Sequence, residues 1–416
     1  MSSVDTSVRR IRTSCCVAGG GPAGMMLGFL LARAGIEVVV LEKHADFLRD
    51  FRGDTIHPST LEVIHELGLL DEFLRRPHSE VRELKGQVGD IEIPLADFSH
   101  LPTRCKFIAL MPQWEFLDFL SGAAKRYPQF QLRMSAAATG LIEEDGRIVG
   151  VEARSAEGLR EIRAELVIAA DGRHSTLRAA AGLEVMNLGA PMDVLWMRLS
   201  RHPGEAKTLL GRFDQGRILV MFDRDDYWQC AFVIRKGAAE EIRRRGLAAF
   251  RQEVASAQPA LADRVGEIAD WDQVKLLTVA VDRLRRWYRP GLLCIGDAAH
   301  AMSPIGGVGI NLAIQDAVAA ANILAPALRR GAVPVERLRA VQQRRILPTR
   351  VIQGMQLIIQ NRVIGRILGS ATNPATLPLP FRLLRAWPML RRIPARLIGM
   401  GFRPEHVRSG GGTLHR

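Results

Sequence analysis

The fold is decided by residues 14–42, which read SCCVAGGGPAGMMLGFLLARAGIEVVVLE. A short apolar run, Ser14–Ala18, leads into a glycine-rich turn, and apolar residues then recur with helical spacing over Pro22–Ala34. The β-branched run Ile36–Leu41 has the composition of a buried parallel strand. The stretch therefore predicts a strand, a tight turn, a helix and a second strand, which form one βαβ unit.

The glycine-rich turn fits the dinucleotide-binding pattern G-x-G-x-x-G at Gly19, Gly21 and Gly24. The first glycine allows the tight turn, the second lets the backbone approach a pyrophosphate, and the third lets helix and strand pack closely. The predicted helix begins with Pro22 and Ala23, so its N-terminus offers amide donors and the positive end of a dipole to the same ligand.

An acidic residue ends the second predicted strand. Glu42 follows Gly24 by 18 positions and precedes Lys43. A carboxylate at this place accepts hydrogen bonds from the hydroxyls of an adenosine ribose. A plain turn is the alternative for an isolated glycine triplet, but strand, helix and acid in this order favour dinucleotide binding. The pattern alone leaves NAD and FAD open.

Two later strands also end in polar, glycine-containing motifs. Glu165–Ala170 runs into Asp171 and Gly172, and Leu292–Ile295 runs into Gly296 and Asp297. Asp297 is suited to bind the hydroxyls of a ribityl chain, and the glycine-rich sequel before the next helix brings amides to one edge of a ligand. The positions expected at that edge are Pro304, Gly307, Gly309, Ile310 and Asn311. The alternatives are simple turns, with Ser175 as a helix cap after the first motif.

With these three fingerprints in order, residues 14 to 330 resemble the group A flavoprotein monooxygenases, the aromatic hydroxylases typified by p-hydroxybenzoate hydroxylase. The resemblance implies tightly bound FAD, transient NAD(P)H, O2, and an aromatic or quinone/polyketide-like substrate. In that chemistry NAD(P)H reduces the flavin, oxygen adds at C4a, and the hydroperoxide transfers oxygen to an electron-rich ring. No side chain need act as a nucleophile, so no catalytic residue is named.

The same resemblance assigns roles to single residues. Asp171 and Gly172 help to hold the fold around the flavin and are linked to NAD(P)H use. Arg52 matches an arginine near the pyrophosphate and the isoalloxazine, and Gln113 matches a flavin-contacting glutamine. A solvated arginine and an ordinary first residue of a helix are the alternatives for these two. For His57 and His300, a structural role is favoured over a role at the flavin.

The expected fold class is α/β, with a Rossmann-type FAD-binding domain, an inserted sheet-rich substrate domain and a C-terminal helical segment. The expected divisions are residues 1–80, 113–184 and 281–330 for the FAD-binding domain, 81–112 for strands of the substrate layer, 185–280 for the substrate-binding sheet and 331–416 for the tail. Candidates for the substrate-facing side chains are Met197, Phe213, Met221 and Trp228, with ordinary sheet core as the alternative.

Several expected elements lie outside the fingerprints. Helices are expected at 113–126, 238–255 and 310–328, and hairpin turns at Asp145-Gly146 and Glu157-Gly158. The tail from 335 to 402 is expected to be helical, with breaks at Pro348, Pro388 and Pro394. No run of 18 apolar residues predicts a transmembrane helix.

The charge of the chain is concentrated in its tail. Of the net +13, residues 326–416 carry +15 from 17 arginines, no lysine and two glutamates, which leaves −2 for the other 325 residues. Basic and apolar residues interleave over Phe381–Phe402, which suits contact with anionic lipid; a helical layer packed on the body is the alternative. The composition therefore predicts possible peripheral membrane contact and no nucleic-acid partner.

The five cysteines show no metal-binding or disulfide pattern, which predicts buried free thiols in a cytoplasmic protein. Two other functions remain open. One is a flavin-dependent reductase of the same fold, of the prenyl-chain reductase type. The other is a non-catalytic, basic protein that binds nucleic acid through salt-dependent contacts.

Overall fold

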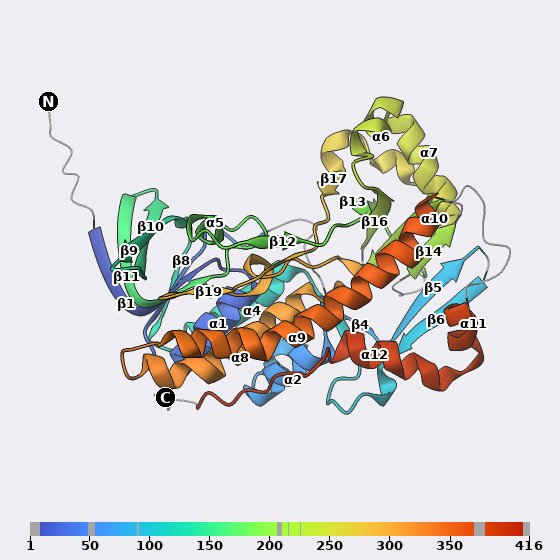
Figure 1. Ribbon diagram of the computed structural model, residues 1–416. Helices are drawn as coiled ribbons and strands as arrows, with labels where there is room; N and C mark the ends of the chain where they lie inside the picture. The colour runs from blue at the N-terminus through green and yellow to red at the C-terminus, as the bar shows by residue number, and fades with distance from the viewer. Residues whose placement is uncertain are drawn as a thin grey trace, which may run out of the picture.

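A computed structural model describes residues 9–48, 55–89, 91–205, 210–214, 216–224, 226–369 and 379–410 of the 416-residue chain. Within them, two large sheets lie towards opposite ends of an elongated molecule (Figure 1). The long helix α9, Val335–Ile359, runs along the molecule between the two ends. The mixture of sheets and helices confirms the predicted α/β class.

The eight-stranded sheet contains the predicted nucleotide-binding unit. Its central strands are parallel and lie in the order β20, β11, β1, β2 and β8. The bounds are Arg9–Ala18 for β1, Val38–Leu41 for β2, Phe130–Arg133 for β8, Gly158–Ala169 for β11 and Leu292–Cys294 for β20. Strands β9 (Ala137–Glu144), β10 (Arg147–Ser155) and β19 (Tyr288–Arg289) extend it with antiparallel pairs. Both predicted hairpin turns connect strands of this sheet.

Three helices pack together beside this sheet. Helix α1, Pro22–Arg33, contacts both α4, Gln113–Ala124, and α8, Gly309–Leu328. Every residue of α1 from Ala23 to Ala32 is buried, which agrees with its nearly unbroken apolar sequence. Burial of this apolar surface is the main stabilising contribution. The core therefore holds β1, the glycine-rich turn and α1 in one rigid arrangement.

The seven-stranded sheet is mostly antiparallel and follows the order β17, β13, β16, β15, β14, β5 and β6. The bounds are Lys275–Leu277, Met192–Ser200, Tyr227–Arg235, Arg217–Asp223, Leu210–Asp214, Glu83–Val88 and Ile91–Asp97. Helices α6, Ala239–Arg245, and α7, Leu247–Ala257, cover one face of it. The single helix predicted over 238–255 was wrong, because Gly246 adopts a φ of +90° and separates the two helices.

Two small sheets and several short helices connect these parts. Strands β3 (Thr55–Ile56), β4 (Ser79–Val81) and β7 (Ile108–Leu110) form one small sheet, and β12 (Val185–Asn187) pairs with β18 (Asp282–Leu284). Helices α2 (Pro58–Glu66), α3 (Leu70–Leu74) and α5 (Thr176–Ala180) are short. Of these, α2 packs against α8 and thereby approaches the third fingerprint.

The tail is helical, but two of its three predicted breaks were wrong. Pro348 lies inside α9, where buried hydrogen bonds on both sides of it, from Arg345 and Gln353, keep the helix in place despite the missing amide. Pro394 lies in the first turn of α12, Arg392–Gly399, where an amide has no helical partner in any case. Only Pro388 begins a separate 3-10 turn, as predicted.

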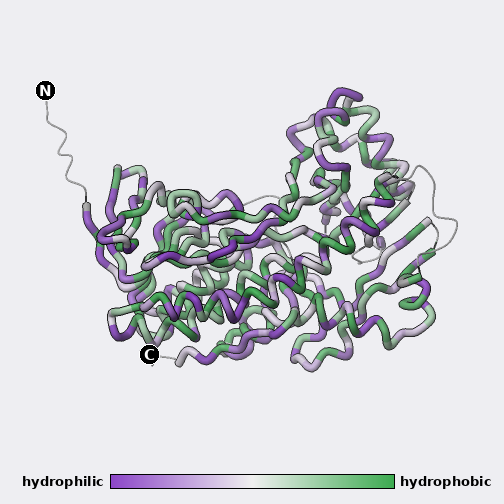
Figure 2. Tube along the Cα trace, in the orientation of Figure 1, coloured by the Kyte–Doolittle hydropathy of each residue, from purple (hydrophilic) through white to green (hydrophobic). Residues whose placement is uncertain are grey.

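The remaining tail elements are a π-helical turn, Gln360–Ile364, and the helices α10, Gly365–Gly369, and α11, Leu379–Ala386. Apolar and polar residues alternate along these segments (Figure 2). Residues 305–328 are long and apolar enough to cross a membrane, yet 83% of their most apolar window is buried inside the protein. This stretch is therefore a core helix.

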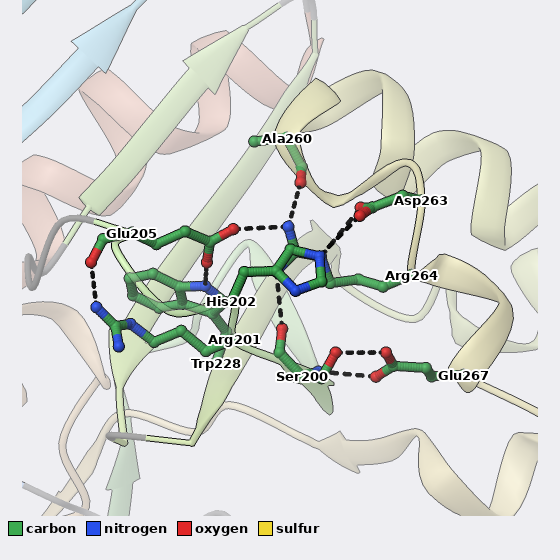
Figure 3. A network of polar contacts seen from close by, with 9 residues as sticks. All are labelled: Ser200, Arg201, His202, Glu205, Trp228, Ala260, Asp263, Arg264 and Glu267. Carbon is green, nitrogen blue, oxygen red and sulfur yellow. Dashed lines mark hydrogen bonds and ion pairs between the residues drawn. The ribbon is translucent and has the colours of Figure 1, made fainter.

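A polar network closes the outer end of the seven-stranded sheet (Figure 3). Arg264 donates to the carbonyl oxygens of Ser200 and Ala260 and to the carboxylate of Glu205, which also accepts the indole N–H of Trp228. The side chain of Arg264 is only 5% exposed. Its bonds therefore connect the end of β13 to the segment after α7, away from the glycine-rich turns.

Candidate functional site

The first glycine-rich turn has the close packing that its sequence predicts. Gly19 adopts a φ of +110°, and a Cβ there would lie 2.2 Å from the carbonyl oxygen of Ala170. A Cβ at Gly24 would lie 1.9 Å from the carbonyl oxygen of Gly19. Both positions therefore require glycine for packing within the protein itself. Pro22 is the first residue of α1, with the extended Gly21 as its N-cap.

Gly21 differs from its neighbours because its surroundings are open. A Cβ built there would meet no atom within 4 Å. The turn therefore leaves space beside the N-terminus of α1, where amide donors and the helix dipole favour an anionic ligand. This cradle fits a pyrophosphate of the kind that FAD carries.

Glu42 lies beside the cradle. One of its carboxylate oxygens accepts the amide of Gly20 at 3.0 Å, and the other accepts the amide of His44 at 3.1 Å. These contacts place the carboxylate at the end of β2, next to the glycine-rich turn. Lys43 is exposed to solvent.

The second fingerprint follows β11. One oxygen of Asp171 accepts the amide of Leu177 at 3.2 Å, and Ser175 caps α5 by accepting the amide of Arg178. The cap agrees with the structural alternative for this motif. The other oxygen, Oδ1 of Asp171, is buried and has no hydrogen-bond partner within the described part of the chain. A buried carboxylate oxygen without a partner is costly, which fits a site completed by a donor from a ligand. Gly172 adopts a φ of +88°.

The third fingerprint lies at the neighbouring strand end, because β11 and β20 pair in parallel. Parallel strands bring their carboxyl ends to one edge of a sheet, and ligands bind at such edges. Asp297 lies there with its side chain 37% exposed and an oxygen 3.8 Å from a guanidinium nitrogen of Arg173. The carboxylate is therefore accessible to a hydroxyl-bearing ligand.

The glycine-rich sequel forms a turn after Pro304 and leads into α8 at Gly309. Gly306 and Gly307 adopt φ values of +77° and +64°. The carbonyl oxygen of Gly307 accepts the hydroxyl of Thr55 at 2.9 Å and lies 3.0 Å from Nε2 of His57. Because this carbonyl is held on the side of residues 55–57, the amide that follows it points the opposite way.

Ile310 and Asn311 are buried, with Ile310 packed in the core. The side-chain oxygen of Asn311 accepts hydroxyls from Ser59 at 2.7 Å and Thr60 at 2.8 Å. Asn311 therefore uses this oxygen to connect α8 with α2. Only its other polar groups are left to contact a ligand. Gln113 begins α4 and is half-buried. Arg52 lies outside the described residues.

A buried ionic cluster behind Asp297 was not predicted from the sequence. Asp316 on α8 accepts the amide of Gly296 at 3.1 Å, lies 2.6 Å from Nε2 of His300 and accepts Nε of Arg345 at 2.9 Å. Burial alone would raise the pKa of Asp316, but the charges and hydrogen bonds of His300 and Arg345 outweigh it and lower the pKa. Arg345 also pairs with Glu405, so the tail supports the Asp297 turn. These residues are spread over positions 296 to 405 of the chain, and no local motif marks them.

The four residues that were predicted to face the substrate lie on two different faces of the seven-stranded sheet. Met197, Met221 and Trp228 are buried beneath α6 and α7, on the face away from the third fingerprint. Their prediction as substrate-facing residues was therefore wrong, and the alternative of ordinary sheet core is correct. Phe213 lies on the other face, in a cluster that includes Ile305 of the glycine-rich turn.

That inner face carries partly buried aromatic side chains that sequence reasoning missed. Trp196 and Phe222 lie in the same cluster as Ile305, and their ring centroids are 5.8 Å apart. Trp196 is the neighbour of Met197, and Phe222 is the neighbour of Met221. Because successive side chains of a strand point to opposite faces, these two aromatic residues lie on the inner face, whereas the two predicted methionines lie on the other. The inner face therefore carries an aromatic and apolar cluster that includes Ile305 of the third fingerprint and Ile364, Ile367 and Leu368 of the tail.

Comparisons with known proteins place this chain among flavin-binding sequences. Residues 12–354 match the family described as FAD binding domain. The chain is 33% identical over 387 residues to the 6-methylpretetramide 4-monooxygenase of Streptomyces rimosus, covering 92% of each chain. It is 29% identical over 321 residues to a 12-dehydrotetracycline 5-monooxygenase/anhydrotetracycline 6-monooxygenase of the same species, covering 74% of this chain and 61% of that protein.

A solved structure shares the fold of this chain. The crystal structure of p-nitrophenol 4-monooxygenase PnpA from Pseudomonas putida matches with a TM-score of 0.75 and 20% identity, covering 94% of this chain and 98% of that one. At this identity the likeness shows the fold alone. The named sequence relatives are monooxygenases, which favours the oxygenase prediction over a flavin-dependent reductase.

Proposed function

Because this chain belongs to the FAD-dependent aromatic monooxygenases, we propose that it hydroxylates a polycyclic, polyketide-like aromatic compound, with NAD(P)H as reductant and O2 as oxidant. The observation that carries the proposal is the inner face of the seven-stranded sheet, where Trp196, Phe213 and Phe222 share a cluster with Ile305. Aromatic side chains bind planar apolar rings through large contact areas and ring stacking.

FAD, when bound, supplies the oxygen-activating redox chemistry, and the chain supplies binding and orientation. The open space at Gly21 is assigned to the pyrophosphate, and the exposed carboxylate of Asp297 to the ribityl hydroxyls. Oδ1 of Asp171, buried without a partner among the described residues, is assigned to a donor of the same ligand. The positive end of α8, which begins at Gly309, favours negative charge on the ligand edge beside it.

The aromatic inner face has a second role in this proposal, which is to keep water from the reacting atoms. An apolar wall excludes water and thereby protects reactive species from hydrolysis. The sequence contains no second G-x-G-x-x-G unit for a permanently bound nicotinamide, so we assign NAD(P)H a transient role.

A cytoplasmic location is part of the proposal. All five cysteines are free and buried, as expected for a reducing compartment. We assign the tail two roles, which are packing on the body of the enzyme and peripheral contact with a membrane. Nucleic acid is not proposed as a partner.

The test is a substrate panel on the purified protein. FAD should be released on denaturation, and a tetracyclic aromatic polyketide should stimulate NAD(P)H oxidation and O2 uptake and gain one oxygen atom by mass spectrometry. A simple phenol such as p-nitrophenol is the matched comparison, because it has one ring. Stimulation without a hydroxylated product, or hydroxylation of the phenol alone, would contradict the proposed substrate class.

A further inference from the structure

The C-terminal hairpin, defined as residues 379–399, consists of α11, the turn through Pro388–Arg391, and α12. Both helices pack against β6 at the end of the molecule that carries the seven-stranded sheet (Figure 1). Arg391 closes the turn by donating to the carbonyl oxygens of Leu384 and Arg385. The hairpin is therefore a defined structural unit.

The inner side of the hairpin is firmly docked. Ala395 is buried in a cluster with Phe98 and Leu101, and a Cβ at Gly399 would lie 2.7 Å from Cδ1 of Leu101. The carbonyl oxygen of Ile398 lies 2.8 Å from Nδ1 of His57. Because α12 is held by these contacts, its opposite side is fixed in an outward orientation.

The outer side exposes large apolar side chains. The exposed fractions are 59% for Trp387, 71% for Met389 and 60% for Ile393, and Leu379 at the start of α11 is 63% exposed. Trp387 and Met389 lie at the turn between the two helices. Exposed apolar side chains gathered on one short segment mark an interaction surface.

The charged side chains of the hairpin itself are all arginines, and Asp97 of β6 lies beside two of them, Arg392 and Arg396. No aspartate or glutamate occurs between Glu336 and Glu405. The exposed arginines of the hairpin are Arg382, Arg385, Arg392 and Arg396. On α12, Ile393 lies on the side of the helix away from the buried Ala395 and Gly399, whereas Arg392 and Arg396, at i, i+4 spacing, lie at the edge between the two sides.

We propose that the outer side of the C-terminal hairpin docks on an anionic lipid bilayer. Trp387, Met389 and Ile393 enter the boundary between headgroups and acyl chains, and the surrounding arginines bind lipid phosphates. An interfacial tryptophan, apolar side chains and an arginine-rich rim with net positive charge are complementary to such a surface. Docking would bring the aromatic-lined sheet close to a lipophilic substrate, but it does not depend on the proposed hydroxylation.

The test is co-sedimentation of the full-length, FAD-loaded protein with vesicles of phosphatidylglycerol and phosphatidylcholine or of phosphatidylcholine alone. Binding should be strong only with phosphatidylglycerol and should weaken as salt is raised. The combined variant Trp387→Ser, Met389→Ser and Ile393→Ser should reduce partitioning at least about tenfold. The combined variant Arg382→Gln and Arg385→Gln should reduce it by about fivefold for each arginine at low salt.

Matched controls come from other parts of the surface. Leu159→Ser with Leu276→Ser removes apolar side chains that are 52% and 44% exposed, and Arg75→Gln with Arg244→Gln removes exposed arginines elsewhere. Both controls should bind vesicles like the unmodified protein. Equal binding of the hairpin and control variants, or equal binding to both vesicle types, would overturn the proposal.

The alternative partner for the outer side of the hairpin is a second copy of the chain, and light scattering tests for it. If the protein is dimeric by light scattering without lipid, and the triple serine variant is monomeric, the apolar side chains serve self-association and the proposal fails. Because sedimentation requires no turnover, failure of the membrane proposal and failure of the hydroxylation proposal give separate results.

Discussion

Nε2 of His57 lies 3.0 Å from the carbonyl oxygen of Gly307, although the two residues are 250 positions apart. The other ring nitrogen faces the carbonyl oxygen of Ile398 at 2.8 Å. A neutral imidazole carries one N–H and can donate to one of these carbonyls, whereas the protonated ring can donate to both. His57 therefore connects the glycine-rich turn of the third fingerprint with the C-terminal hairpin.

The protonation of His57 should make the stability of the protein depend on pH. Burial lowers the pKa of His57 from 6.5 to about 4, against the opposing effect of its two carbonyl contacts. The unfolded chain therefore binds the proton more readily, and this contribution to stability is lost as pH falls from about 6.5 to about 4. The loss should reach about 3 kcal/mol in the free energy of unfolding, measured by urea titration at several pH values. His57→Gln should flatten this slope, whereas Thr55→Val, which also removes a bond to Gly307, should keep it.

Substitutions at two glycines of the first fingerprint should have different effects, one on ligand binding and the other on stability. Gly21→Val should fold normally, because its side chain enters open space and its φ of −73° suits any residue. It should lose FAD, seen as loss of 450-nm absorbance, because the side chain fills the cradle. Gly24→Ala should instead unfold at least about 2 kcal/mol more easily, since its Cβ meets the carbonyl of Gly19. Retained flavin in Gly21→Val would contradict the assignment of the cradle.

The ionic cluster at Asp316 should matter for both stability and cofactor binding. Asp316→Ala leaves Arg345 buried without its partner on α8, and removal of one member of a buried pair costs about 3–5 kcal/mol. It also removes the acceptor for the amide of Gly296, so flavin titration should show weaker binding. In the double variant Asp316→Leu with Arg345→Met, the stability loss should be smaller while FAD binding stays weak. Full FAD affinity in that double variant would show that the cluster does not position the Asp297 turn.

Substitutions at two adjacent residues of β13 should affect different properties, one the kinetics and the other the stability. Trp196→Ala, on the inner face, should raise KM for the aromatic substrate and increase NAD(P)H oxidation that is not matched by product. Met197→Ala, beneath α6 and α7, should cost about 2–5 kcal/mol of stability with KM unchanged, because it opens a cavity in the core. Steady-state kinetics with product analysis, together with thermal unfolding, distinguishes the two. The reverse pattern would place the substrate on the other face of the sheet.

The strand ends that carry the three fingerprints were predictable because each signal is local. A glycine turn between a strand and a helix, or an acidic residue directly after a buried strand, is visible within a few residues of sequence. The faces of β13 were not predictable in this way. Both Trp196 and Met197 are large and apolar, since the strand is covered on each side, so no polar alternation marks which face lies towards Ile305.

The sequence by itself thus determined the βαβ unit, its dinucleotide-binding pattern and the basic tail, since these depend on neighbouring residues and on composition. Only the tertiary structure decided which side chains face the third fingerprint, that Pro348 and Pro394 are accommodated within helices, and that Asp316, Arg345 and Glu405 form one cluster. Those outcomes depend on contacts between segments far apart in the chain. The free energy of such contacts outweighs local preference, and no single segment contains both partners.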